Sequence, residues 1–160
     1  MTSQQELKKF HVMIMNQFLK DLYSVLNSKE CFNYFAEMMQ QSIQDEVYDR
    51  YSPTQYSRRG EDGGLLDPNN YNYSVRIDTD GIRVFMKNMT RGVGRAFYID
   101  EGIVTGLADG KNFYEYGAIS RMGTFPRDFY TYMEVIVEDK HKKLQNIIQR
   151  QMNKKGWKLK

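Results

Sequence analysis

The 160-residue sequence has few of the residues that cross-link a small fold through disulfides or metal ions, and few of those that anchor a chain in a membrane. Cys31 is the only cysteine, so the chain can form neither an internal disulfide nor a metal site built from several of its own thiolates. No stretch approaches the roughly 18 consecutive apolar residues of a membrane span, and the first ten residues lack the pattern of a secretory signal peptide. These absences favour a soluble protein made in a reducing cytoplasm.

Residues typical of catalytic and metal sites are also scarce. His11 and His141 are the only histidines, and neither has the spacing of a two-histidine zinc site. Cys31 falls beside an apolar stripe, where a buried thiol is commoner than a nucleophile. The segment 78–81 is only a fragment of a calcium loop, and the glycines at 92 and 94 lack the setting of a dinucleotide loop. We therefore predict that the chain is not an enzyme and uses no metal or cofactor.

What the chain does have is the composition of a globular protein, with 41% hydrophobic and 27% charged residues. A chain of this length buries about 68–70% of its unfolded surface and needs no metal or disulfide to fold. We expect a single domain over residues 1–160. Its expected parts are a helical segment (1–51), a long loop (52–72), a sheet with a glycine-rich insert (73–124) and a C-terminal helix (126–155).

Two helices are predicted at the N-terminal end. From residue 4 to about Leu26, apolar side chains recur every three or four residues, which is the period of a helix with one buried face. Ser28 suits the N-cap of a second helix that continues this spacing to about Tyr51. We expect both stripes to form core or subunit interface. They comprise Leu7, Phe10, Ile14, Phe18, Leu22 and Val25 in the first helix, and Phe32, Phe35, Met39, Ile43 and Val47 in the second.

The middle of the chain follows a different pattern. Pro53, Pro68 and three glycines predict a long loop over 52–72. Beyond it, apolar and polar residues alternate over 73–87 around Asp80-Gly81, a pair that favours a tight hairpin turn. In the glycine-rich insert we expect short strands around 96–104 and a turn of helix or a strand at 112–116.

A long helix is predicted over residues 126–155. Pro126 suits its first turn, and Gly156 suits the position just after its end. The stripe of this helix is mainly apolar but includes Lys140. A helix of about thirty residues would span about 45 Å. The predicted fold class is α+β, with N-terminal helices, a small antiparallel sheet containing the 73–87 hairpin, and a long C-terminal helix.

The net charge of +3 is unevenly distributed. Residues 121–160 carry 10 basic and 4 acidic groups, whereas residues 1–50 carry 5 and 7. A basic end of this kind can contact DNA or an acidic partner, and Lys154, Lys155 and Lys158 are the candidate contacts. The other interpretation is a solvated helix end with a lysine tail.

Four stretches, taken in order, resemble the neck or tail-completion proteins of tailed bacteriophages, a family of small head-tail joining proteins. They are VYDRYSPTQYSRRGEDGGLLDP (Val47–Pro68), KNMTRG (Lys87–Gly92), FYEYG (Phe113–Gly117) and FPRDFYTYMEVIVED (Phe125–Asp139). The resemblance covers roughly residues 40–150. It implies a compact α+β domain, copies of which assemble near the head-tail junction or the upper tail.

The resemblance also implies a structural function in the virion, in a protein made in the host cytoplasm. Its expected partners are copies of itself in a ring, other connector or tail proteins and, through non-specific contact, genome DNA; no membrane is involved. The sequence has twelve tyrosines, and Tyr and Arg are enriched at protein interfaces. The candidate subunit contacts are Tyr51, Tyr56, Arg58, Arg59, Tyr114, Glu115 and Tyr116.

A small nucleic-acid-binding accessory protein is the alternative from another functional class. The basic C-terminal end and the arginines interleaved with aromatic residues favour it. The acidic first half disfavours it, and the sequence contains no zinc-finger, RRM or helix-turn-helix pattern.

Overall fold

The computed structural model describes residues 3–49, 61–79, 81–90, 112–113, 119–120 and 129–159. The α+β class is confirmed, with helices at both ends of the chain and an antiparallel hairpin between them. The elements in chain order are α1 (Ser3–Leu26), α2 (Lys29–Ile43), the π-helical turn η1 (Gln44–Tyr48), the 3₁₀ turn η2 (Pro68–Asn70), β1 (Tyr71–Asp78), β2 (Gly81–Asn88), β3 (Asn112–Phe113), β4 (Ile119–Ser120), α4 (Phe129–Asp139) and α5 (His141–Lys154).

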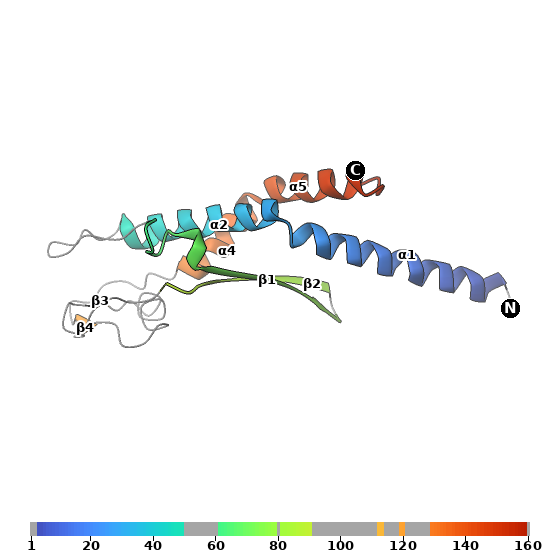
Figure 1. The fold of residues 1–160 in the computed structure, drawn as a ribbon, viewed down its shortest axis with the longest axis horizontal. Helices are drawn as coiled ribbons and strands as arrows, with labels where there is room; N and C mark the ends of the chain where they lie inside the picture. Colours follow the sequence, from blue (N-terminus) through green and yellow to red (C-terminus); the bar gives the residue numbers. More distant parts are fainter. Residues whose placement is uncertain are drawn as a thin grey trace.

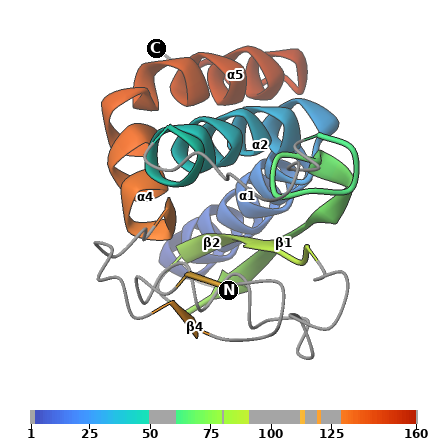
Figure 2. The same ribbon diagram turned by 90° about the vertical axis from the view of Figure 1, so that its left-hand side faces the viewer.

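Helix α2 lies at the centre of this arrangement. Figures 1 and 2 show α5 on one side of α2 and the β1–β2 hairpin on the other. Helix α2 contacts α4 and α5, and α1 contacts α5 and β1. The core therefore forms where the two ends of the chain meet. It includes Cys31, Tyr34, Met38, Met39 and Ile43 of α2, and Phe129, Met133, Ile136, Ile147 and Met152 of the C-terminal helices.

Ser28 caps α2, as the sequence predicts. Its backbone is extended, and its hydroxyl accepts a hydrogen bond from the backbone N of Cys31 at 3.3 Å. The predicted stripe of this helix is buried, apart from the half-buried Phe32. The helical path then continues through η1, whose Val47 is also buried.

The predicted hairpin is confirmed, and its register places the apolar residues of both strands on one face, except for Phe85, which lies on the other. Val75 lies opposite Val84, and Asp78 lies opposite Gly81. Gly81 is therefore the first residue of β2 rather than part of the turn itself. Its φ of 145° explains why glycine suits this position. Asp80 lies outside the described residues.

The loop expected over 52–72 is shorter than predicted, because η2 and the first residues of β1 occupy 68–72. The carboxylate of Asp67 accepts hydrogen bonds from the backbone N of Gly63 at 3.0 Å and of Asn69 at 2.9 Å. These bonds form a compact turn ahead of the hairpin. Residues 52–60 lie outside the described part of the chain.

The glycine-rich insert is described only at two short strands, β3 and β4, which pair with each other. Strand β3 agrees with the strand alternative for 112–116. The strands expected around 96–104 fall outside the described ranges.

A buried cluster of hydrogen bonds connects the turn before the hairpin to the end of β2. The side-chain amide of Asn88 donates to the carbonyl of Leu65 at 2.8 Å, and its Oδ1 accepts from the backbone N of Thr90 at 3.0 Å. The Thr90 hydroxyl lies within hydrogen-bond distance of Asn88 Oδ1 (2.6 Å) and of the Gly64 carbonyl (3.0 Å). Both side chains are nearly inaccessible to solvent. Buried polar groups need such partners, so the cluster positions the turn.

The C-terminal segment is helical, as predicted, but it is divided into α4 and α5 at Lys140. Figure 2 shows the two helices meeting at an angle. Lys140 lies within the polar run 138–143, at a position where an unbroken helix would turn its side chain toward the core. Burying a charged side chain in the core costs free energy, so an unbroken helix is disfavoured at this point. The hydroxyl of Tyr34 lies 3.5 Å from the carbonyl oxygen of Val137 and 3.3 Å from that of Lys140. These polar contacts stabilise the break, so the helix does not reach the predicted 45 Å.

The predicted end of the C-terminal helix is confirmed. Helix α5 ends at Lys154, and Gly156 follows with a φ of 96°. Pro126 and the expected first turn lie outside the described residues.

We predict that Asn88→Ala lowers the free energy of unfolding by about 2 kcal/mol. The substitution leaves the buried Thr90 N–H without its partner and removes one of the two hydrogen bonds to the Leu65 carbonyl, which keeps the bond from the Tyr71 hydroxyl. Urea denaturation followed by circular dichroism measures this change. Asn72→Ala is the matched control, because Asn72 lies exposed on the neighbouring strand. Equal losses in the two variants would contradict the assignment.

Candidate interaction surface

The first half of α1 extends beyond the rest of the structure, as Figure 1 shows. Every residue from Ser3 to Gln17 is exposed, and we call this segment the projecting half of α1. Leu7, Phe10 and Ile14, which the sequence predicts to be covered, are 68%, 55% and 37% exposed. Of the two alternatives given for this stripe, core or subunit interface, the first half of α1 does not form core within this chain. The expectation that the stripe forms a subunit interface stays a prediction.

The second half of α1 packs as predicted. Phe18 and Leu22 are partly buried against the core, and Val25 is buried. The ring of Phe18 meets the ring of Trp157 edge to face, with centroids 5.0 Å apart. The exposed stripe thus continues directly into the packed one, and the C-terminal residues cover α1 only from about Phe18 onward.

Asp21 fastens the C-terminal end of the chain to α1. Its carboxylate accepts hydrogen bonds from Gln17 Nε2 at 3.0 Å and Trp157 Nε1 at 3.1 Å, and it lies 3.5 Å from Lys155 Nζ. The hydrogen bond from Gln17, followed by that from Trp157 and the charge of Lys155, holds the pKa of Asp21 below its usual value. These contacts lie just after the end of the projecting half of α1.

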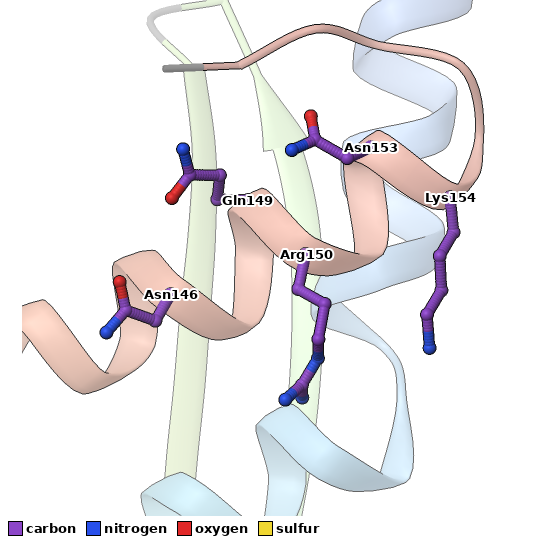
Figure 3. Close-up of a pocket in the computed structure, with 5 residues that line it drawn as sticks. All are labelled: Asn146, Gln149, Arg150, Asn153 and Lys154. Carbon is purple, nitrogen blue, oxygen red and sulfur yellow. The ribbon is translucent and has the colours of Figure 1, made fainter.

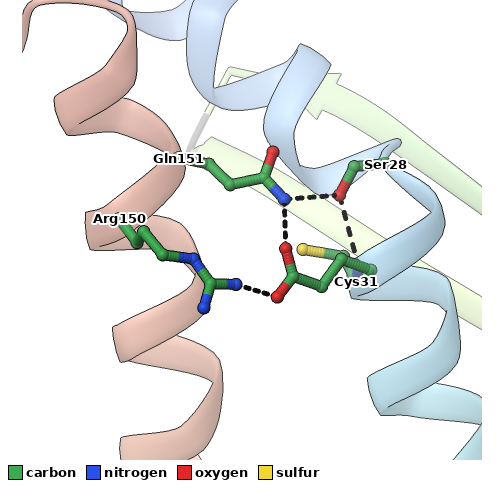
Figure 4. Close-up of polar contacts among 5 residues, drawn as sticks. Ser28, Cys31, Arg150 and Gln151 are labelled. Atoms are coloured by element: carbon green, nitrogen blue, oxygen red, sulfur yellow. Dashed lines mark hydrogen bonds and ion pairs between the residues drawn. The ribbon is translucent and has the colours of Figure 1, made fainter.

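Ion pairs hold α5 against α2. Lys143 Nζ lies 2.6 Å from a carboxylate oxygen of Glu37, and Arg150 pairs with Glu30. Gln151 donates to Glu30 at 2.7 Å, and Figure 4 shows this contact together with the capping hydroxyl of Ser28. Each exposed pair contributes at most about 1 kcal/mol, so the row orients α5 more than it stabilises the fold.

These pairs change the interpretation of the basic C-terminal end. Of the three predicted contact residues, Lys155 is paired with Asp21. Lys154 and Lys158 form no ion pair with any other residue that the structure describes. A large part of the basic excess therefore balances acidic groups of α1 and α2, which the uneven charge along the sequence did not reveal.

The outer face of α5 carries a shallow hollow of about 500 Å³ (Figure 3). Its side chains are amides and cations, with no carboxylate among them. Gln149 Nε2 donates to the carbonyl of Leu159 at 3.0 Å, and Asn153 Oδ1 accepts from the Leu159 backbone N at 2.9 Å. Such a surface suits a polar or anionic partner. The hollow is lined by Asn146, Gln149, Arg150, Asn153 and Lys154.

The residues considered for catalysis do not come together. Cys31 is fully buried, and burial raises the pKa of its thiol, which keeps it protonated. His11 lies on the projecting half of α1, and His141 Nδ1 is 2.6 Å from the carbonyl of Glu138. Across the described ranges, the structure contains no group of three His, Cys, Asp or Glu side chains suited to a metal ion. Among these same ranges, no helix has the length and apolarity of a membrane span.

The seven predicted subunit contacts lie outside the described residues: Tyr51, Tyr56, Arg58, Arg59, Tyr114, Glu115 and Tyr116. The sequence analysis expected the stripe of α1 to form core or subunit interface but did not distinguish its first half from its second. A signal was present, because Val12, Met13 and Met15 make other sides of this helix apolar too. A helix with one buried face normally has a polar opposite face.

We predict that acidification releases the C-terminal end from α1. A carboxyl group with a lowered pKa in the folded state stabilises that state above its unfolded pKa, here 3.8, and this contribution is lost as the pH falls through the folded value. Trp157 is the only tryptophan, so its emission should shift to longer wavelength below about pH 4. Asp21→Asn should lack this step, and an unchanged titration in that variant would contradict the role of Asp21.

A family model described as YomN matches residues 6–154, nearly the whole chain. No curated protein and no solved structure matches the sequence significantly. The matched range includes most of α1, the hairpin and both C-terminal helices. The chain belongs to the YomN family, a phage-related protein family.

Proposed function

We propose that this phage-associated chain is a virion structural protein, part of the neck or upper tail that joins the DNA-filled head to the tail. Family membership supports an association with phage, and the four motifs that resemble neck and tail-completion proteins support the finer role. The observation that carries the proposal is the projecting half of α1, with apolar side chains that no described residue covers.

An uncovered apolar helix is typical of a protein that completes its packing on assembly. Contiguous exposed apolar patches mark interaction sites, and burying them stabilises a complex by about 25 cal/mol per Å². The fifteen residues from Ser3 to Gln17 span about 22 Å, which is long enough to reach across a neighbouring subunit. The function proposed is therefore mechanical joining without turnover.

The proposed partners are copies of this chain in a ring and other connector or tail proteins. The candidate subunit contacts fall in two segments of the sequence. Those before the hairpin are Tyr51, Tyr56, Arg58 and Arg59, and those after it are residues 114–116. Aromatic and arginine side chains supply much of the binding energy at protein interfaces. In the virion these contacts would join those made by the projecting half of α1.

A nucleic-acid-binding accessory protein is the second candidate. The hollow on α5 favours it, because amide and cationic side chains without a carboxylate can contact phosphate groups. The ion pairs of Lys143, Arg150 and Lys155 reduce the charge left for such contacts. Weak, non-specific contact with passing genome DNA is compatible with either candidate.

We predict that quantitative mass spectrometry of purified intact phage particles finds this chain at a low, constant copy number, as a single ring requires. Particles from a phage that lacks the gene should show unjoined heads and tails by electron microscopy. Expression of the wild-type chain in trans is the control and should restore joined particles. Absence of the chain from intact particles would contradict the virion role.

We predict that combined Lys154→Gln and Lys158→Gln substitution weakens binding of the isolated protein to DNA at low salt, because both lysines lack an ion pair among the described residues. Lys155→Gln should have less effect, since Lys155 is paired with Asp21. Fluorescence anisotropy with a labelled duplex measures both. Tight binding that survives about 200 mM salt would favour the accessory-protein function over the structural one.

A further inference from the structure

We propose that two copies of the free chain associate through the projecting halves of α1, which pair antiparallel about a twofold axis. The inference concerns the chain alone and does not rest on the head-tail role. It identifies the occupant of the exposed stripe as the same stripe of a second copy.

The spacing of the stripe is that of a helix-pairing seam. Leu7, Phe10, Ile14 and Gln17 follow one another at intervals of three, four and three residues, which matches the a and d positions of a heptad. When two such seams face each other antiparallel, Phe10 of each copy packs against Ile14 of the other. Leu7 then packs beside Gln17 at both ends, so all of the exposed seam is used.

The charges beside the seam match only when the helix meets itself reversed. Glu6, Met13 and Lys20 occupy the flanking g positions of this heptad. The register that aligns Phe10 with Ile14 also places Glu6 of each copy beside Lys20 of the other. Glu6 and Lys20 are exposed, and neither forms an ion pair with another residue in the described ranges. The twofold axis therefore provides two intermolecular ion pairs and no like-charge contact between these groups.

The covered part of α1 explains why the pair is antiparallel. Beyond Gln17 the apolar face of α1 is covered within the same chain, where Phe18 packs against Trp157 and the core. A parallel pair would bring both C-terminal ends together at one end of the helices. An antiparallel pair places the two bodies at opposite ends and uses only exposed residues, as the projection of α1 in Figure 1 allows.

The expected affinity is modest. Two helices of about 22 Å packed about 8–10 Å apart form a contact at or below the low end of stable interfaces, which bury about 1,200 Å². We expect a dissociation constant on the order of 1–100 µM. The contact about the twofold axis joins the same surface of both copies, whereas the contacts that close a ring join two different surfaces. The proposed dimer and the proposed ring therefore have different symmetry.

Charge reversal tests the register in the full-length protein. By sedimentation equilibrium, the wild type should dimerise, while Glu6→Lys and Lys20→Glu should each weaken the dimer about fivefold or more, because each creates two like-charge contacts. The double variant should return to within about twofold of the wild type. Lys8→Glu is the matched control, since it changes the net charge as Lys20→Glu does but lies away from the seam.

Cysteine cross-linking tests the orientation. Met13 of each copy should lie beside Met13 of the other, so Met13→Cys should form a disulfide-linked dimer on mild oxidation. The two Glu6 positions should be separated by about 21 Å along the helices, so Glu6→Cys should not link. Buried Cys31 does not compete for the oxidant in the folded chain.

A wild-type protein that stays monomeric at about 200 µM overturns the proposal, as does an oligomer larger than two. A dimer that is insensitive to both charge reversals, or that links through Glu6→Cys as readily as through Met13→Cys, also overturns it. None of these results changes the copy number measured in intact particles, so a failure here is distinct from a failure of the virion role.

Discussion

The burial of α2 on several sides is the constraint on which the other elements depend. Met38 and Met39 are both fully inaccessible, and methionine adapts its shape to fill contacts with more than one neighbour. On the sheet side, the ring of Phe32 meets that of Tyr73, with centroids 5.8 Å apart. On the helical side, the hydroxyl of Ser42 donates to the carbonyl of Phe129 at the start of α4. With α2 covered in this way, only part of α1 finds a place in the core.

Local signals explain which parts of the fold could be predicted from the sequence. A cap such as Ser28, a helix end such as Gly156 and the alternation within the hairpin each act over a few residues, and all three are found in the structure. The break at Lys140 has a weaker local signal, because neither proline nor glycine marks it and only the polar run 138–143 interrupts the apolar stripe. It depends on Tyr34, a residue of another helix that is more than 100 positions away in the chain.

The candidate surface was harder to predict for a related reason. Periodicity identifies the apolar face of a helix, but it does not show how far along the helix a neighbouring element extends. Leu7 and Val25 belong to the same sequence pattern, yet one is exposed and the other buried. Net charge has the same weakness, since the partners of Arg150 and Lys155 lie about 120 or more residues away. The family match places the chain among phage-related proteins independently of these contacts.

The hydrogen bond between Asp21 and Trp157 joins residues 136 positions apart, so it has a consequence for the order of folding. A ribosome releases the N-terminal helices long before the residues that cover the second half of α1 exist. During that interval the whole apolar stripe of α1, and not only its first half, is open to solvent and to other nascent chains. Non-local closure of this kind slows folding. The last residues synthesised therefore decide when the exposed apolar surface of α1 shrinks from the whole length of the helix to its first half.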